Sequence, residues 1–374
     1  MSAPDDARLY EAELIRALAY ALPAAAETPE DGRDLAQAAR IQREGWRAGA
    51  QRAIQFLGAC LRDRPERAAL RLALADLLLD RPDAAQAQAV LDAAPGATDN
   101  GAAGTGVELR RAAAAAMLDT REAALAILQR IADMLPSVPD VRNTLLDAVS
   151  LLSLPPQTAA ASIASPRGQC LNLGSGKLLH RSTEQQRWIN TDIAPLPGVQ
   201  VVDAFRYPWL WDNDSFDRIT ASHLAEHIPH QPAVEQQAGD ALFDALQASG
   251  YVRRLAELDG FFAFFAEAWR VLKPGGEIDI VCPYGLSFGA IQDPTHTRSI
   301  VPATVDYLAW TENGNFDYGL PFRYESVSLG FGGLSPRYQS LLAEPDASQR
   351  IMAAASTEWN VIQTLAFSLR KVPL

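Results

Sequence analysis

Hydrophobic residues recur every three to four positions through the first part of the chain, which is the spacing of amphipathic helices. Between residues 33 and 62, apolar positions 35, 38, 41, 46, 50, 54 and 57 share one face, which predicts one long helix. Shorter helices are expected at residues 65–79, 84–94, 106–118, 120–135 and 140–152. Val, Ile and Thr, which favour strands, are sparse here. We therefore expect an all-α domain over residues 1–153.

Residues 121–136 resemble the second helix of a tetratricopeptide repeat, because Ala124, Leu128, Ile131 and Pro136 fall at the spacing of that repeat. Residues 64–95 are a looser copy, and the Gly-rich residues 95–106 are expected to form a mobile insert. Repeat-like helix pairs stack because no pair buries its apolar stripe alone. An irregular helical bundle is the alternative. The resemblance implies a surface for a protein partner or for self-association.

The pattern changes after a linker at residues 154–167, which is rich in Pro, Ala and Ser. From residue 168, short apolar runs alternate with helical patterns, which predicts a parallel sheet in an α/β domain spanning residues 168–374. Strands are expected at residues 169–173, 188–193, 199–203, 215–222 and 277–283, and a helix at residues 261–272.

Composition excludes several classes of protein. The 374 residues include 45 acidic and 33 basic side chains, for a net charge of −12, so a nucleic-acid phosphate backbone is an unfavourable partner. No apolar run approaches the roughly 18 residues of a membrane span, and the acidic start predicts no secretory signal. Three scattered cysteines predict neither a disulfide framework nor a structural zinc site, so we expect a cytoplasmic protein.

Candidate chemistry gathers where the predicted strands end. Gly174 and Gly176 follow the first strand, where glycines allow a tight turn and a close approach of ligand to backbone. A third glycine of the dinucleotide fingerprint is absent, which argues against a pyrophosphate site. Asp192 ends the second strand and can accept hydrogen bonds from both hydroxyls of a ribose. Asp203 ends the third strand.

These blocks, together with Ser215-Phe-Asp-Arg-Ile, Ser222-His-Leu-Ala-Glu-His-Ile and Arg270-Val-Leu-Lys-Pro-Gly-Gly, resemble class I S-adenosylmethionine-dependent methyltransferases. The resemblance implies a Rossmann-like sheet of seven strands, with the last two antiparallel near residues 323–331 and 360–372. The polar stretch 177–186 predicts that the usual first helix is short or shifted. The resemblance also implies S-adenosyl-L-methionine as cofactor, bound by Leu173, Gly174, Ser175, Gly176, Asp192, Ile193, Asp203, Ala204 and Ser222.

Methyl transfer to a hydroxyl benefits from a general base, and histidine suits that role near neutral pH. The candidate bases are His223, His227 and His296. On the substrate side we place Glu226, Asp293 and Arg298. The expected acceptor is a small molecule or a glycan, methylated at oxygen. Residues 231–258 have a helical apolar face and are interpreted as a lid.

Other readings of the same residues stay open. His223-Leu-Ala-Glu-His227 also fits the His-x-x-Glu-His pattern of zinc peptidases, although Pro229 interrupts a helix there. A divalent ion on Glu226, His227 and His230 is a further variant, while the preferred interpretation holds no metal. The sheet domain is alternatively an inactive adaptor, or a protein methyltransferase guided by the helical domain.

Overall fold

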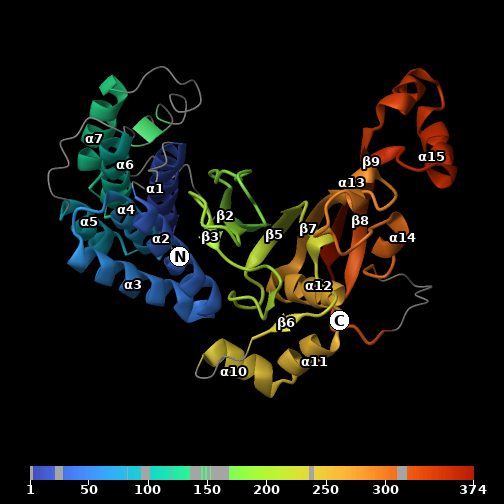
Figure 1. Ribbon diagram of the computed structural model, residues 1–374, viewed down its shortest axis with the longest axis horizontal. Helices are drawn as coiled ribbons and strands as arrows, with labels where there is room; N and C mark the ends of the chain where they lie inside the picture. Colours follow the sequence, from blue (N-terminus) through green and yellow to red (C-terminus); the bar gives the residue numbers. More distant parts are fainter. Residues whose placement is uncertain are drawn as a thin grey trace. The chain divides into compact units, whose positions relative to one another are not determined.

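A computed structural model describes residues 3–21, 28–81, 83–93, 102–118, 120–134, 145, 148–149, 152, 168–235, 240–309 and 318–374. The chain divides into two compact units, and each is considered by itself (Figure 1). The first unit comprises residues 1–168 and 176–202, and the second comprises residues 169–175 and 203–374. The predicted linker lies outside the described residues, and the predicted domain boundary stays a prediction.

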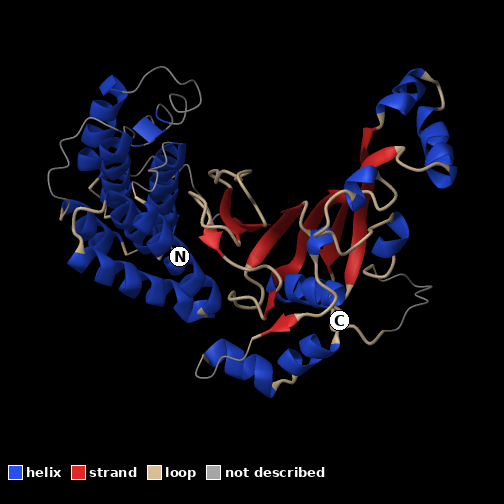
Figure 2. Cartoon of the chain, in the orientation of Figure 1, coloured by secondary structure: helices blue, strands red, loops and turns tan. Residues whose placement is uncertain are grey.

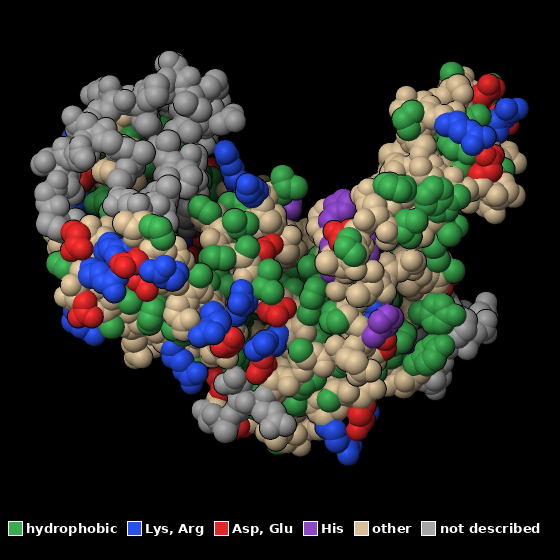
Figure 3. Space-filling model, viewed as in Figure 1, with side chains coloured by type: hydrophobic (Ala, Val, Ile, Leu, Met, Phe, Trp, Pro, Cys, Tyr) green, Lys and Arg blue, Asp and Glu red, His purple; other side chains and the backbone are tan. Residues whose placement is uncertain are grey.

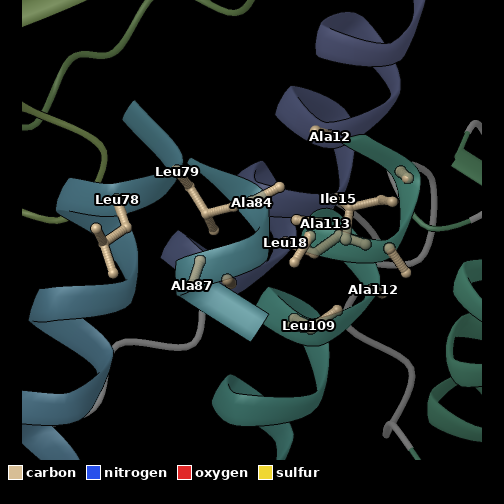
Figure 4. Packing of buried hydrophobic residues seen from close by; sticks show 14 of the residues in the cluster. Ala12, Ile15, Leu18, Leu78, Leu79, Ala84, Ala87, Leu109, Ala112 and Ala113 are labelled. Atoms are coloured by element: carbon tan, nitrogen blue, oxygen red, sulfur yellow. The ribbon is translucent and has the colours of Figure 1, made fainter. Parts of the chain in front are cut away.

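The N-terminal part of the first unit is helical, as the apolar periodicity predicted. Its helices are α1 (Ala3–Ala21), α2 (Pro29–Glu44), α3 (Gly49–Asp63), α4 (Ala68–Asp80), α5 (Ala84–Asp92), α6 (Ala102–Met117) and α7 (Arg121–Met134). Their shared core contains aliphatic side chains from all seven of these helices, and Figure 4 shows members from α1, α4, α5 and α6. Alanines such as Ala112 and Ala113 are fully buried, and their small size lets the helices approach closely.

The predicted long helix at residues 33–62 is wrong, because the chain breaks into α2 and α3 around the 3-10 turn η1 (Trp46–Ala48). A Cβ on Gly49 would lie 2.1 Å from the carbonyl oxygen of Gln42, so only glycine permits this approach. Trp46 adopts a positive φ of 48°. The apolar pattern runs unbroken across the turn, which is why periodicity alone predicted one helix.

Two other predictions in this region meet the limits of the described residues. The predicted insert at 95–106 is helical from Ala102, where α6 begins, and residues 95–101 lie outside the described part. Of the predicted helix 140–152, only four residues are described.

The strands form a mixed sheet of seven in the order β3-β2-β1-β5-β7-β9-β8 (Figure 2). Strand β5 runs parallel to β1 and to β7, whereas β9 is antiparallel to both β7 and β8. The part of the sheet from β3 to β7 therefore has the doubly wound order. The chain adds β2 and β3 on one side of β1, and then β5 and β7 on the other side. The last strand inserts antiparallel between β7 and β8. This is the Rossmann-like methyltransferase fold, which confirms the predicted fold class. The strands are β1 (Gly168–Leu173), β2 (Gln186–Asp192), β3 (Gln200–Val201), β5 (Phe216–Ser222), β7 (Leu272–Pro283), β8 (Tyr324–Leu334) and β9 (Ile362–Lys371).

The connection between β1 and β2 contains no helix: residues 174–185 are all described and form turns and coil. The polar stretch at 177–186 predicted a short or shifted first helix, and the structure departs further from the usual pattern, because these residues form no helix at all. The remaining elements belong to the second unit. They are β4 (Arg206–Tyr207) and β6 (Ala233–Val234), which pair with each other, η2 (Ala225–His227), α10 (Ala241–Ala248), α11 (Tyr251–Glu257), α12 (Gly260–Val271), α13 (Phe288–Ile291), α14 (Pro302–Val305), η3 (Pro336–Ala343) and α15 (Ala347–Thr357).

Helix α12 confirms the predicted helix at 261–272 and carries a buried ion pair. Glu267 is fully buried, and its carboxylate accepts hydrogen bonds from Arg270 at 2.8 Å and from the backbone N–H of Trp209. Arg270 also donates to the carbonyls of Trp209 and Trp211 at 2.9 and 2.8 Å. Burial alone would lower the pKa of Arg270, but Glu267 more than offsets burial and raises it. The pair thereby fixes the segment that leads into β5.

Strand β7 begins at Leu272, five residues before the predicted strand start at residue 277. The extension comes from backbone pairing between distant segments, because Leu272 lies opposite Phe216 of β5 in the ladder.

Among the described residues, no helix combines the length and the hydropathy that crossing a membrane requires. The three cysteines are unpaired. Burial raises the pKa of Cys170 to about 11 and that of Cys282 to about 12, so neither is a thiolate at neutral pH. The expected cytoplasmic location stays a prediction.

Candidate active site

The carboxyl ends of β1 and β5 lie side by side, since these strands are parallel neighbours with Leu173 opposite Ala221. The strand order reverses between them, and open α/β sheets bind ligands at such a switch point. Gly174 follows β1 with a φ of 62°, and a Cβ there would lie 2.8 Å from Cδ1 of Leu224. The turn after β1 therefore packs against the turn after β5, which requires glycine at position 174.

Within the first unit, the Gly176 turn is joined to the end of β2. The Gly176 N–H donates to Oδ2 of Asp192 at 2.9 Å, and the Ala194 N–H donates to Oδ1 at 2.9 Å. Each carboxylate oxygen keeps a further lone pair, so both can still accept a hydroxyl. Gly176 has a φ of 51°, and a Cβ on it would meet no described atom within 4 Å. The backbone is thus open to a ligand beside a carboxylate suited to a ribose.

The other predicted cofactor residues differ in environment. In the second unit, Asp203 accepts the Phe205 N–H at 3.0 Å, and the buried Ala204 accepts the indole N–H of Trp209 at 3.0 Å through its carbonyl. Ser222 is exposed at the tip of β5, whereas Ser175 is buried. In the first unit, the Ile193 side chain is 53% exposed. An apolar side chain held in solvent beside Asp192 is a surface on which a base can stack.

Directly after β5, His223 adopts a left-handed conformation with φ 55°, and its N–H donates to the carbonyl of Val281 at 2.7 Å. A histidine in this conformation is uncommon and is worth attention at a strand tip. Its Nδ1 lies 3.3 Å from Oε1 of Glu226, while the imidazole is 55% exposed. Histidine side chains reach the surface on the face shown in Figure 3. His223 and Glu226 form an exposed imidazole with a buried carboxylate behind it.

Three predicted site residues from two distant segments of the sequence come together here. The imidazoles of His227 and His296 pack edge to face with ring centroids 4.7 Å apart. The atoms of Glu226, His227 and His296 that could bind a metal all lie within 4.8 Å of one another. Asp293 is adjacent, with Oδ2 4.0 Å from Nε2 of His296. The hydroxyl and the N–H of Thr295 hold the pKa of Asp293 below its ordinary value.

Glu226 itself is only 2% exposed, and its Oε2 has no hydrogen-bond partner among the residues that the structure describes. A buried carboxylate oxygen without a partner costs about 1–3 kcal/mol or more relative to a satisfied one. Such a group is uncommon in a native fold and requires an explanation.

Arg298, which we predicted on the substrate side, is held by other groups of the protein. Its guanidinium donates to the carbonyls of Ile228 and Pro229, both at 2.9 Å, and pairs with Asp259 at 2.8 Å. The side chain is 14% exposed. Its charge is already compensated by Asp259, and a substrate-binding role for Arg298 stays a prediction.

The His-x-x-Glu-His segment does not form the helix that a zinc peptidase site needs. Residues 225–227 form one 3-10 turn, and His223 precedes it in a left-handed conformation. His230 contacts a different carboxylate, with its Nδ1 3.5 Å from Oδ2 of Asp259. The predicted trio of Glu226, His227 and His230 is therefore not the one brought together, because His296 takes the third place.

Sequence reasoning missed Leu224 and Thr295. Leu224 faces Gly174, and the Thr295 hydroxyl lies 3.1 Å from Nδ1 of His227. Both residues lie in the two His-containing stretches of the sequence, and that position could have drawn attention to them. Which residues of the two stretches come into contact is decided only by the tertiary structure.

A cavity of about 890 Å³ lies within the first unit, between α1 and residues 176–200. Its walls include Tyr10, Glu13, Trp188 and Asn190, and Gly176 is the one predicted cofactor residue that lines it. The cavity and the predicted nucleoside site thus share a single described residue.

A tetratricopeptide-repeat family model matches residues 50–106, which include α4 and α5. No curated protein sequence matches the chain. Among solved structures, an S-adenosylmethionine-dependent methyltransferase of Archaeoglobus fulgidus is 18% identical with a TM-score of 0.34, covering 55% of this chain and 86% of its own. The YcgJ protein of Bacillus subtilis is 13% identical with a TM-score of 0.32, covering 57% and 99%. Phosphoethanolamine N-methyltransferase 2 of Haemonchus contortus, solved with S-adenosyl-L-methionine, is 13% identical with a TM-score of 0.29, covering 55% and 49%. The fold assignment rests on the strand order.

Proposed function

We propose that the protein is an S-adenosylmethionine-dependent methyltransferase that methylates a hydroxyl group of a small molecule or a glycan. The observation that carries this proposal is the switch point, where the Gly174 turn after β1 packs against Leu224 after β5. The same turn after β5 presents His223 and Glu226. A glycine turn and an acid–imidazole pair at adjacent strand ends suit a nucleoside cofactor facing an acceptor.

The residues present fit S-adenosyl-L-methionine, which when bound supplies an electrophilic methyl group on a sulfonium. Asp192 would hold the ribose hydroxyls, since both of its oxygens retain a lone pair beside the open Gly176 backbone. Gly174 and Ser175 would run along the methionine part. Asp203 and Ala204 would lie beside the adenine, with Ile193 against its ring and Leu173 and Ser222 completing the contacts.

His223 is assigned as the general base. Its Nδ1 faces the Glu226 carboxylate, so Nε2 is the atom that receives the proton of an acceptor hydroxyl. Glu226 orients the ring and stabilises the imidazolium that forms. His227, His296 and Asp293 line the acceptor side of the same cluster. We expect His223→Asn to lower kcat by about 10²- to 10⁴-fold, the usual contribution of such a base, with little change in cofactor affinity.

Calorimetry with the cofactor tests the proposal. Wild-type protein should bind S-adenosyl-L-methionine, and Asp192→Ala should weaken binding about a hundredfold, since two hydrogen bonds to a charged group are lost at about 1.5 kcal/mol or more each. The matched control is Glu344→Ala, which removes an exposed carboxylate after η3. If wild type does not bind the cofactor, the adaptor interpretation is favoured instead. If Asp192→Ala binds as tightly as wild type, Asp192 does not hold the ribose.

The acceptor class is tested with radioactive cofactor in a cell extract. Label in the small-molecule or glycan fraction supports the proposal, whereas labelled protein bands support protein methylation guided by the helical region.

For the helical region, we propose binding of a protein partner or a second copy of the chain. The repeat model over residues 50–106 supports this, because stacked helical repeats present extended binding surfaces. Analytical ultracentrifugation of the full chain separates the two: a dimer mass indicates self-association, and a monomer mass directs the search to another protein.

A further inference from the structure

The cluster of Glu226, His227 and His296 has the ligand types and the fixed positions that a metal site requires. We propose that Glu226, His227 and His296 bind one divalent first-row transition-metal ion. Metal binding is a property of these residues alone; its catalytic use, to hold the acceptor oxygen, rests on the proposed function.

The two segments that supply the ligands are fixed to each other by hydrogen bonds. The N–H groups of Thr297 and Arg298 donate to the carbonyl of Glu226 at 2.8 and 3.0 Å. The Thr297 hydroxyl and the Arg298 guanidinium donate to the carbonyl of Ile228 at 2.6 and 2.9 Å. Segments about 70 positions apart in the sequence are therefore held in register. Such bonding fixes the ligand positions before any ion arrives, which is what a metal site requires.

Both imidazoles are held in the tautomer that leaves Nε2 as a ligand atom. His296 Nδ1 lies 3.1 Å from the carbonyl oxygen of Ala290, which can only accept, so Nδ1 carries the proton. The Thr295 hydroxyl donates to Oδ1 of Asp293 at 2.7 Å, so it accepts from Nδ1 of His227 at 3.1 Å. Outer partners that fix the tautomer and the orientation of a histidine are typical of metal-binding imidazoles.

The carboxylate supplies the third ligand atom. Oε1 of Glu226 faces His223, while the buried Oε2 has no hydrogen-bond partner among the described residues. Since Glu226 is 2% exposed, water does not readily satisfy that oxygen. A cation within the 4.8 Å cluster would compensate its charge.

The ligand set determines the class of ion. Two imidazole nitrogens and one carboxylate oxygen suit Zn²⁺, Mn²⁺, Co²⁺ or Fe²⁺, whereas Mg²⁺ and Ca²⁺ prefer oxygen ligands. Three protein ligands leave at least one coordination position open, as catalytic metal sites do. An acceptor hydroxyl is the group that would fill it.

The test uses the full chain, freed of metal with a chelator and then titrated with Zn²⁺ by calorimetry and with Co²⁺ by visible absorption. We expect one site per chain. His296→Ala and Glu226→Gln should each weaken binding by at least about tenfold, in line with the losses that even outer partners produce. His230→Ala is the matched control, because that histidine lies nearby and pairs with Asp259 instead.

Thr295 is a positioning residue in this proposal, since it touches His227 and not the ion. Thr295→Val should weaken Co²⁺ binding about tenfold, and Thr295→Ser should restore it, because serine keeps the hydroxyl. A merely structural role for Thr295 would change the thermal midpoint without changing the absorption spectrum of bound Co²⁺.

The proposal is overturned if the chelator-treated chain binds neither ion, or if His230→Ala loses as much affinity as His296→Ala. All metal measurements are made without cofactor. Metal binding without cofactor binding would leave this site intact and remove the methyltransferase proposal, whereas the reverse result would remove only the metal site.

Discussion

Two regions of the second unit each bury a glutamate, and the two carboxylates differ in how completely they are hydrogen-bonded. On α12, Glu267 is fully buried and both of its oxygens accept hydrogen bonds from Arg270. On η2, Glu226 is almost as buried, but its Oε2 has no partner in the part of the chain that the structure describes. Residue type and burial are the same, and only the completeness of the hydrogen bonding differs.

Under the proposed function, this difference separates a structural charge from a functional one. A buried ion pair with every group satisfied holds elements together, and removing one partner leaves the other charge uncompensated. A buried carboxylate with an unmet acceptor is retained at a cost in stability, and such costs concentrate at functional sites. The positive φ of His223, which lies beside Glu226, is a second feature there that lowers the stability of the fold.

The most severe test of the comparison is Glu267→Ala. We expect the free energy of unfolding to fall by about 3–5 kcal/mol, because Arg270 would remain buried without its partner. Chemical denaturation of the full chain measures the loss. Unfolding is followed by tryptophan fluorescence, to which Trp209, a neighbour of Glu267, contributes. Glu257→Ala, on the exposed surface of α11, is the control and should change stability by less than about 0.5 kcal/mol.

Glu226→Gln is the counterpart of that variant. With chelator present, the same denaturation experiment should show a change below about 1 kcal/mol in either direction, since the substitution removes a buried charge that lacks full compensation. A loss as large as that of Glu267→Ala would erase the distinction between the two regions and show that Glu226 is structural.

The glycine turn gives a second way to separate structure from function. Gly176 and Gly250 both have positive φ, and a Cβ on either would meet no described atom within 4 Å. Each alanine variant should therefore lose about 1–2 kcal/mol of stability from the left-handed backbone alone. Only Gly176→Ala should also weaken cofactor binding, by about tenfold or more, because the added methyl would occupy space needed by the ligand. Equal cofactor affinities for the two variants would place the ligand elsewhere.

A modest, pH-dependent effect is expected in the helical region, where Asp31 is a buried carboxylate with its hydrogen bonding complete. Burial raises its pKa, but Arg67 and Thr28 outweigh burial and lower it below the ordinary value. A lowered pKa in the folded state stabilises the fold above about pH 4 and ceases to do so as the pH falls through the folded pKa. Asp31→Asn should thus cost about 1 kcal/mol at neutral pH, through loss of the α2 capping box. The difference from wild type should shrink in acid, as followed by thermal denaturation across pH. Asp63→Asn, exposed at the end of α3, should show no such pH dependence.

How far the sequence leads is clear from particular elements. The apolar run 169–173 and the helix pattern 261–272 each had one dominant period, and both were located to within a residue or two. The break between α2 and α3 was missed because Gly45 and Gly49 disrupt the backbone without disturbing the apolar pattern. The start of β7 was missed because it is set by the pairing of Leu272 with Phe216 of β5, a contact between segments far apart in the sequence.

The sequence by itself determined the helical character of the N-terminal region, the α/β character of the second region and the chemical identity of the candidate groups, because local periodicity and strand-end residues carry that information. The order of the strands followed only from the resemblance to class I methyltransferases. Only the tertiary structure decided which of those groups meet. It brought His296 rather than His230 to Glu226 and His227, used Arg298 as a tether, and left one oxygen of Glu226 unsatisfied. These outcomes depend on contacts between segments far apart in the chain, and no local pattern encodes the distance between two such segments.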